Sequence, residues 1–109
     1  MKQPCTYILC SRRNGVLYVG VTSALSLRMF QHAQGLSDGF TKRYGIKRLV
    51  YHEMHATMPE AIAREKQLKS WRRAWKVKLI ESFNPEWQNL FDEVTGEVFD
   101  GPADIERRR

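Results

Sequence analysis

Two tyrosines and an arginine–histidine pair have the residue types and the spacing that proton transfer and anion binding use. Tyr7 and Tyr18 lie inside the short apolar runs "TYILC" and "VLYVGVT", and Arg28 and His32 follow four residues apart. Residues four positions apart lie on the same face of a helix. A helix face that also carries apolar residues at this spacing packs against the hydrophobic core. Singly, each has a structural explanation: a strand tyrosine bonded at the sheet edge, an arginine that extends to solvent, or a hydrogen-bonded core histidine. Together, Arg28 and His32 indicate the polar edge of a cleft.

A glutamate in the second half of the chain is also out of place. Ala61, Ile62 and Leu68 define the apolar stripe of a predicted helix, and Glu65 falls in the middle of that stripe. Burying a carboxylate costs free energy unless it is paired with a cation. Two partners fit this position: the guanidinium of Arg28, which is the simpler one, and a metal ion.

The elements that position these side chains begin with a hairpin. Residues 6–10 and 16–22 are rich in Tyr, Ile, Val and Leu, and the "SRRNG" between them carries an Asn-Gly turn signal. Gly20 inside the second strand predicts a bulge or a close approach by another group. A helix is predicted to follow over residues 22–35, with Gly35 at its end.

The remaining elements are a polar loop, a strand and two helices. Met58-Pro59 opens the first of these helices, because proline is tolerated in the first turn. Asn84-Pro85 ends the second, because the residue before a proline disfavours helical geometry. The predicted spans are a loop over 36–45, a strand over 46–54, a helix over 58–69 and a helix over roughly 72–82.

These elements predict one α/β domain over residues 1–91. In the order β-β-α-β-α-α they form a three-stranded, mainly antiparallel sheet flanked by helices. From 92 to 109, Gly, Pro and charged residues dominate, so we expect a flexible C-terminal tail. The whole chain has 109 residues, the size of one modest domain.

Charge is distributed unevenly along the chain. The net charge is +6, yet residues 60–80 alone carry +5, and residues 91–109 carry −3. The first 90 residues therefore hold +9. A field of this sign favours a polyanionic partner, nucleic acid first. A well-solvated basic surface without a partner is the alternative.

The cysteines and the apolar runs bear on the cellular compartment. Cys5 and Cys10 fall in one predicted strand and should point to opposite faces, so we expect two free structural thiols. No apolar run approaches the ~20 residues that a membrane span needs. The N-terminal "MKQPCTYILC" has no secretory h-region. We therefore expect a cytoplasmic protein without a membrane partner.

The order and spacing of the polar residues resemble the GIY-YIG nuclease family. The first motif is represented by Cys5-Thr6-Tyr7 and the second by Tyr18-Val19-Gly20, with ten residues between the two tyrosines. Arg28 follows ten residues after Tyr18, and His32 four later, as in the family. The chain is most similar to small stand-alone members related to the nuclease module of the nucleotide-excision-repair incision subunit.

The resemblance runs from about Thr6 to Trp87, most of the chain. The blocks "FTKRYG", "LVYHE", "AIAREKQLKSW" and "FNPEW" also resemble later blocks of the small members. Cys5 and Thr6 stand where the family has a glycine and an isoleucine, positions at which small members vary. Gly20 matches the family and would let the backbone approach the site.

The resemblance implies phosphodiester hydrolysis with one divalent cation. Glu65 matches the family's metal ligand, and a single carboxylate with water and phosphate oxygens suits Mg²⁺ or Mn²⁺. Arg28 would hold phosphate oxygens with its fork of donors. Tyr7 is the expected general base, and Tyr18 and His32 would orient water or phosphate.

The expected function is a metal-dependent endonuclease that cleaves DNA by structure rather than by sequence, in repair or recombination. RNA as a substrate and a protein partner stay open, as does the oligomeric state. The alternative is a catalytically weak nucleic-acid-binding module that acts with a partner. Basic residues expected to contact the nucleic-acid backbone are Lys42, Arg43, Lys66, Lys69, Arg72 and Arg73.

Overall fold

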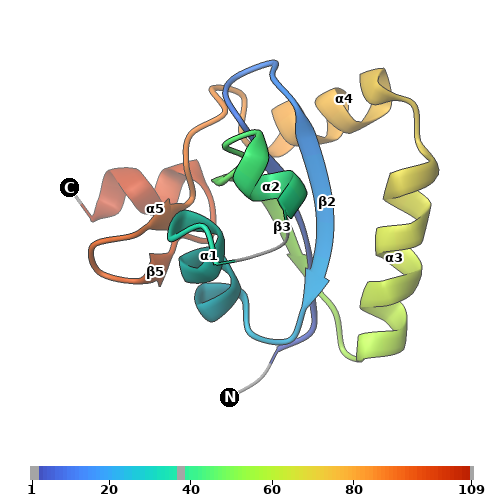
Figure 1. The fold of residues 1–109 in the computed structure, drawn as a ribbon, viewed down its shortest axis with the longest axis horizontal. Coiled ribbons are helices and arrows are strands. Elements are labelled where there is room, and N and C mark those ends of the chain that lie inside the picture. Colours follow the sequence, from blue (N-terminus) through green and yellow to red (C-terminus); the bar gives the residue numbers. More distant parts are fainter. Residues whose placement is uncertain (1–2, 37–38, 109) are drawn as a thin grey trace.

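The structure is a computed structural model that describes residues 3–36 and 39–108. A three-stranded sheet stands at its centre, with helices on both faces and a small C-terminal hairpin and helix at one side (Figure 1). The elements are β1 Cys5–Cys10, β2 Leu17–Thr22, α1 Leu25–Ala33, α2 Gly39–Arg43, β3 Arg48–Met54, α3 Met58–Ser70, α4 Arg73–Phe83, β4 Phe91–Asp92, β5 Glu97–Val98 and α5 Pro102–Arg107.

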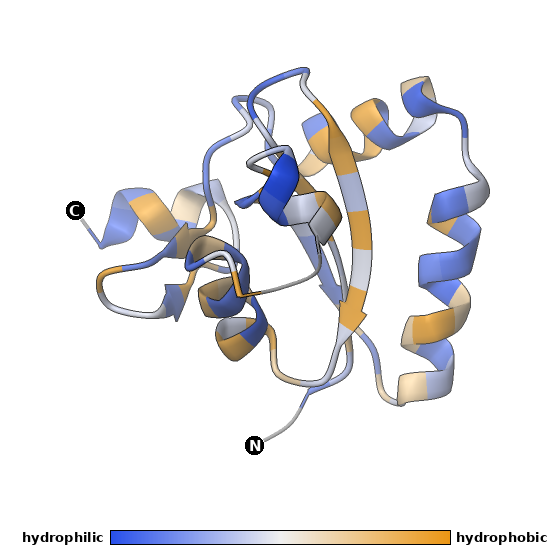
Figure 2. Cartoon of the chain, viewed as in Figure 1, coloured by the Kyte–Doolittle hydropathy of each residue, from blue (hydrophilic) through white to orange (hydrophobic). Residues whose placement is uncertain are grey.

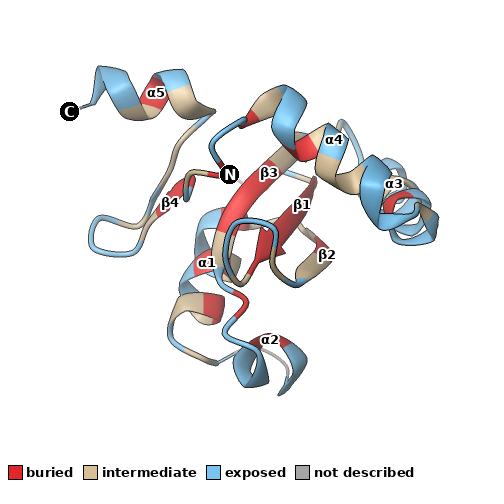
Figure 3. Cartoon of the chain, turned by 90° about the horizontal axis from the view of Figure 1, so that it is seen from above, coloured by how far each residue is buried: buried red, intermediate tan, exposed pale blue. Residues whose placement is uncertain are grey.

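The central sheet has the strand order β2-β1-β3, and both pairings are antiparallel. This confirms the predicted α/β fold class. Every residue of β1 is buried because strands flank it on both edges and helices cover both faces (Figure 3). The predicted hairpin joins β1 to β2, and Asn14 takes the left-handed conformation that its turn requires, with φ of 59°.

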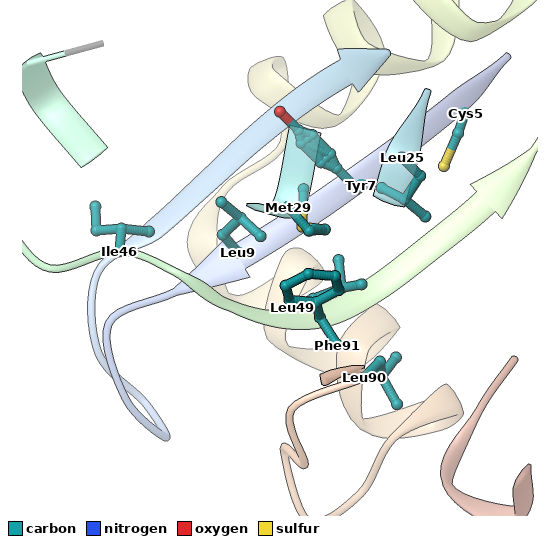
Figure 4. Close-up of a cluster of buried hydrophobic side chains, with 9 residues drawn as sticks. All are labelled: Cys5, Tyr7, Leu9, Leu25, Met29, Ile46, Leu49, Leu90 and Phe91. Carbon is teal, nitrogen blue, oxygen red and sulfur yellow. The ribbon is translucent and has the colours of Figure 1, made fainter. Parts of the chain in front are cut away.

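Side chains of β1 alternate between two hydrophobic clusters. One cluster contains Cys5, Tyr7 and Leu9 and packs against α1 (Figure 4). The other contains Ile8 and Cys10 and packs against α3 and α4. Both thiols are free and buried, on opposite faces as the strand period predicts.

Helix α3 has a side-chain cap at its start, and a hydrogen bond from β1 and a buried stripe hold the helix against the second face of the sheet. Thr57 accepts a hydrogen bond from the Glu60 N–H at 3.3 Å and caps the helix. Thr6 Oγ1 on β1 donates to the Ala61 carbonyl at 2.8 Å. Ala61 and Leu68 are fully buried, but Ile62 is exposed, so its assignment to the apolar stripe is wrong.

The predicted loop over 36–45 contains the short helix α2, which the sequence analysis missed. Residues 37 and 38 lie outside the described residues. Thr41 is buried, so α2 packs against the rest of the domain through this residue. The following strand β3 begins at Arg48 rather than at residue 46.

The C-terminal segment is packed on the core, which corrects the prediction of a flexible tail for residues 92–108. The Phe99 N–H donates to the Leu90 carbonyl at 2.8 Å, and the Phe99 carbonyl lies 2.9 Å from His52 Nε2. Val98 and Ile105 pack against the cluster that contains Tyr7. Gly and Pro serve here as turn and helix-start residues rather than as disorder signals.

None of the helices in the described ranges has the length and apolar content that a membrane crossing requires.

Candidate active site

Three aromatic rings from three elements converge on the α1 face of the sheet. The ring centroids of Tyr7 and Tyr18 lie 6.4 Å apart, and the His32 ring lies 6.0 Å from Tyr7 and 5.8 Å from Tyr18. Tyr7 and His32 are buried, with 1% and 4% of their surfaces exposed, and Tyr18 is half-buried. Residues that are far apart in the sequence thus form one cluster.

The Tyr7 ring crosses over β2 because the residue beside it there has no side chain. Tyr7 pairs with Gly20 in the β1–β2 register. A Cβ on Gly20 would lie 2.4 Å from Tyr7 Cζ and 2.5 Å from its hydroxyl oxygen. The hydroxyl points away from the aliphatic side chains of the cluster (Figure 4). Of the two predictions for Gly20, the structure shows the close approach.

A hydrogen-bonded chain runs from Tyr7 through His32 to α2. The Tyr7 hydroxyl lies 3.2 Å from His32 Nε2, and His32 Nδ1 lies 3.3 Å from Thr41 Oγ1. Thr41 is buried, with only 3% of its surface exposed. The sequence analysis did not single out Thr41, although it belongs to the "FTKRYG" block.

Arg28 lies against the same hydroxyl. It is hydrogen-bonded to Tyr7, and its proximity to both tyrosines raises the pKa of its guanidinium. Arg28 Nη1 also donates to Gln31 Oε1 at 3.3 Å. Because a guanidinium only donates, the Tyr7 oxygen faces Arg28 as an acceptor. The distances allow an arrangement in which His32 Nε2 accepts from Tyr7 and Nδ1 donates to Thr41.

Tyr7 holds its proton in this environment. Burial raises its pKa from 10.0 to about 12, and the hydrogen bond from Arg28 opposes that rise without overcoming it. At neutral pH the phenol is therefore neutral. Proton acceptance by Tyr7 requires that its own proton moves on, and His32 is the neighbour placed to receive it.

Glu65 lies in the middle of the buried stripe of α3, where the sequence places it. Only 16% of its side chain is exposed, and the ammonium of Lys69 lies 3.4 Å from its carboxylate. The predicted salt bridge to Arg28 is replaced by this i,i+4 pair, since Arg28 binds Tyr7 and Gln31 instead. Helix α3 runs beside β2, on the other side from α1 (Figure 1).

The donor set at Glu65 fits a hard divalent cation. The Lys69 side chain is 54% exposed, so water can solvate its ammonium when a cation takes its place at the carboxylate. Within residues 3–36 and 39–108, no three His, Cys, Asp or Glu side chains cluster as a metal cage. A single carboxylate completed by water and substrate oxygens is the mode that Mg²⁺ commonly uses.

An aromatic surface continues outward from Tyr18 along α2. The Phe40 ring stacks on Tyr18 with centroids 6.4 Å apart, and the Tyr44 ring lies 5.1 Å from Phe40. Both are about half exposed. The predicted nucleic-acid contacts Lys42 and Arg43 are exposed on this helix. These two aromatic residues were not among the predicted contacts because the sequence pattern indicated a loop there.

The other predicted nucleic-acid contacts lie on the opposite side of the sheet. They are exposed residues of α3 and of the junction with α4, and α3 is largely hydrophilic along its length (Figure 2). The basic residues therefore form two groups, one on α2 and one on α3 and α4. The second group consists of Lys66, Lys69, Arg72 and Arg73.

Comparison with known proteins agrees with this arrangement. The model of the GIY-YIG catalytic domain matches residues 3–78. A UPF0213 protein of Staphylococcus aureus (strain Mu3) is 35% identical over 74 residues, which cover 68% of this chain and 88% of the relative. UPF0213 protein SSP2268 of Staphylococcus saprophyticus is 37% identical over 68 residues, 62% of this chain and 83% of the relative. No solved structure matches the chain significantly.

A three-stranded antiparallel sheet that brings two tyrosines, an arginine and a histidine together defines a nuclease-type domain. The chain belongs to the GIY-YIG family and is similar to the UPF0213 proteins.

Proposed function

We propose that this protein is a divalent-metal-dependent endonuclease that hydrolyses DNA phosphodiester bonds. The observation that carries the proposal is the cluster in which the Tyr7 hydroxyl lies over Gly20, between Arg28 and His32. A structural tyrosine needs one hydrogen-bond partner, whereas this hydroxyl has a cation on one side and a proton acceptor on the other. That combination suits catalysis at a phosphate.

Arg28 is the proposed phosphate ligand. Its guanidinium offers a planar fork of donors, of which the bonds to Tyr7 and Gln31 use only a part. The remaining donors can hold two nonbridging oxygens of a phosphate and stabilise the charge that develops on them. Arg28 would thereby place the scissile phosphate next to the Tyr7 hydroxyl.

Tyr7 and His32 are proposed to move the proton of the attacking water together. The water gives a proton to the Tyr7 oxygen while the Tyr7 proton passes to His32 Nε2, 3.2 Å away. Tyr7 then stays neutral throughout, which accommodates its pKa of about 12. The water oxygen bonds to phosphorus as the bond to the leaving oxygen breaks. Tyr18 would orient the water or the phosphate from the neighbouring strand.

Glu65 is the residue that would hold the metal ion, with Mg²⁺ or Mn²⁺ as the expected cation. A bound divalent cation supplies charge stabilisation to the phosphate and to the leaving oxygen. Glu65 is suited to this task by its burial and by the exposed position of its present partner, Lys69. The Thr6–Ala61 hydrogen bond holds α3, and with it Glu65, against β1.

DNA is the proposed substrate, recognised by its structure rather than its sequence, and RNA is a possible second substrate. The predicted contacts Lys42, Arg43, Lys66, Lys69, Arg72 and Arg73 are exposed basic residues that position a phosphate backbone without reading bases. A role in DNA repair or recombination in the cytoplasm fits this specificity. A protein partner could add selectivity to so small a domain.

Cleavage of a panel of labelled substrates tests the proposal. Linear, nicked, flapped and branched DNA are incubated with Mg²⁺ or Mn²⁺ and the wild-type, Tyr7→Phe, Glu65→Gln and Glu93→Gln proteins. Glu93 is exposed on the β4–β5 hairpin and serves as the matched control. We expect product from the wild type and the control, and at least a 100-fold slower rate from the other two. Equal rates in all four proteins contradict the proposal.

A catalytically weak nucleic-acid-binding module is the second candidate. The observation that favours it is the raised pKa of Tyr7, which opposes the formation of a phenolate. This candidate predicts that the wild type binds the panel with salt-dependent affinity and releases no product with either cation.

A further inference from the structure

A groove at the junction of α3 and α4 takes no part in the chemistry proposed above. It has a volume of about 380 Å³ and is lined by Trp71, Trp75, Lys78, Leu79 and Ser82. We call it the tryptophan groove. Two indole rings and a leucine line it together with a lysine and a serine. This surface is mainly apolar although it belongs to the most basic part of the chain.

The two indole rings are held differently. Trp71 packs with one side against the cluster that contains Leu68 and Ile80, whereas Trp75 is 51% exposed. Their centroids lie 6.0 Å apart with an angle of 85° between the planes. Trp71 therefore forms a fixed wall, and the ring of Trp75 presents accessible surface to solvent. Trp87, the third tryptophan, is fully buried and contributes nothing to this surface.

Guanidinium groups accompany both rings. The Arg64 Cζ lies 5.2 Å from the centroid of Trp71, and the Arg72 Cζ lies 5.0 Å from that of Trp75. Both distances are within the range of a cation–π interaction. Arg64 is ion-paired with Glu53 at 2.8 Å, so Arg72 and Lys78 supply the available positive charge beside the apolar groove. Residues 60–80 as a whole carry +5.

We propose that the tryptophan groove binds the unpaired bases of a single-stranded nucleic acid. Aromatic side chains that stack bases, combined with cations that follow the phosphate backbone, are the general features of single-strand binding. Trp75 supplies the stacking ring, Trp71 closes one side, and Arg72 and Lys78 neutralise the adjoining phosphates. An apolar protein segment would fill the groove but would leave Arg72 and Lys78, which form no ion pair among the described residues, without anionic partners, so the charge favours nucleic acid.

The position of the groove relates it to the proposed active site. Trp71 follows Glu65 by six residues, which is ~9 Å along a helix axis. Stacked bases repeat every ~3.4 Å, so this axial rise corresponds to about three stacked bases. A single-stranded stretch next to the cleaved bond would reach it. This relation rests on the proposed function, whereas binding of single strands to the groove does not.

Equilibrium binding in the presence of EDTA tests the proposal without any cleavage. Labelled oligothymidylate and a fully paired hairpin are titrated with the wild-type, Trp75→Ala, Trp75→Phe and Val94→Ala proteins. Val94 is 91% exposed on the distant hairpin and serves as the matched control for loss of an exposed apolar side chain. Circular dichroism confirms that each variant is folded.

The expected result is about a tenfold loss of affinity for the single strand in Trp75→Ala, since base stacking on an aromatic ring accounts for that much. Trp75→Phe should recover most of the affinity, Val94→Ala should match the wild type, and hairpin binding should change little. The slope of log affinity against log salt should stay constant in Trp75→Ala, because no phosphate contact is lost. The same slope should fall by about one in Arg72→Gln.

Equal single-strand affinity of folded Trp75→Ala and wild type overturns the proposal. A change in sedimentation on Trp75→Ala, with unchanged oligonucleotide binding, also overturns it and identifies the groove as a protein contact. Cleavage separates the two proposals. If the wild type cleaves but its single-strand affinity does not depend on Trp75, the endonuclease proposal stands and the groove proposal is overturned. If the wild type never cleaves but its single-strand affinity depends on Trp75, only the groove proposal stands.

Discussion

The ring of Tyr7 occupies the space that a side chain on Gly20 would fill. The two residues are register partners on β1 and β2, and an added Cβ would come within 2.5 Å of the Tyr7 hydroxyl oxygen. The backbone of β2 thus sets where that hydroxyl lies relative to Arg28 and His32. A glycine in the second family motif has a steric function here, which is to give the first motif's tyrosine its position.

Gly20→Ala should displace the Tyr7 ring and reduce activity. Overpacking a filled core typically costs ~1–3 kcal/mol of stability, and the hydroxyl would move from its place between Arg28 and His32. We expect a loss of cleavage of at least tenfold together with a lowered unfolding midpoint in urea. Gly39→Ala is the control, because nothing lies within 4 Å of a Cβ at that position. Shortening Tyr7 to leucine in the Gly20→Ala background should restore stability but not activity.

Stability should fall between pH 10 and about 12 because of Tyr7. Its pKa is 10.0 as a free side chain and about 12 in the folded protein, so the unfolded chain loses the proton first. The stabilising contribution is fully present below pH 10 and is lost as the pH rises toward 12. Cys5, Cys10 and Tyr51 also have raised pKa values through burial and add to the slope.

The contribution of Tyr7 to this loss of stability is measured as the difference between two proteins. Urea unfolding at several pH values should show a shallower decline for Tyr7→Phe than for the wild type across this window. Identical slopes in both proteins would mean that Tyr7 is ionised in the folded state as easily as in the unfolded one. The buried position of Tyr7, with 1% of its surface exposed, would then be wrong.

Thr41 should act as a positioning residue for His32. Its hydroxyl lies 3.3 Å from His32 Nδ1, where it would accept the proton of the tautomer that leaves Nε2 free for Tyr7. Thr41→Val keeps the shape but removes the acceptor, and we expect about a tenfold lower cleavage rate with a shifted pH profile. Thr41→Ser should restore both. An unchanged pH profile in a folded Thr41→Val protein contradicts this role.

The sequence predicted the sheet well because its signals are local. The Asn-Gly turn, the strand-forming composition of residues 6–10 and the proline at the start of α3 each act over a few residues, and the structure shows all three. The alignment of Arg28 and His32 on one helix face is equally local, and the structure brings both to Tyr7. The fold class followed from these elements.

The missed features depend on contacts between distant parts of the chain. Thr41 becomes part of the cluster only because α2 folds back onto α1, which no spacing in "LSDGFTKRYG" reveals. Lys69 rather than Arg28 pairs with Glu65, because α1 and α3 lie on different sides of β2. The C-terminal segment looked flexible by composition, yet its Val98 and Ile105 pack against the core.

Ile105→Ala should measure how far the C-terminal segment belongs to the fold. Ile105 on α5 packs against the cluster of Tyr7, Leu90 and Phe91. Removing a partly buried isoleucine side chain should cost about 2 kcal/mol of unfolding free energy, and Val94→Ala on the exposed hairpin should cost nothing measurable. Urea unfolding followed by tryptophan fluorescence checks this, because Trp87 is fully buried in the other cluster and Trp71 packs against that cluster. A single transition with a lower midpoint in Ile105→Ala shows that both faces of the sheet unfold together with α5. An unchanged midpoint would mean that residues 92–108 contribute nothing to the core and would return them to the flexible tail that composition predicted.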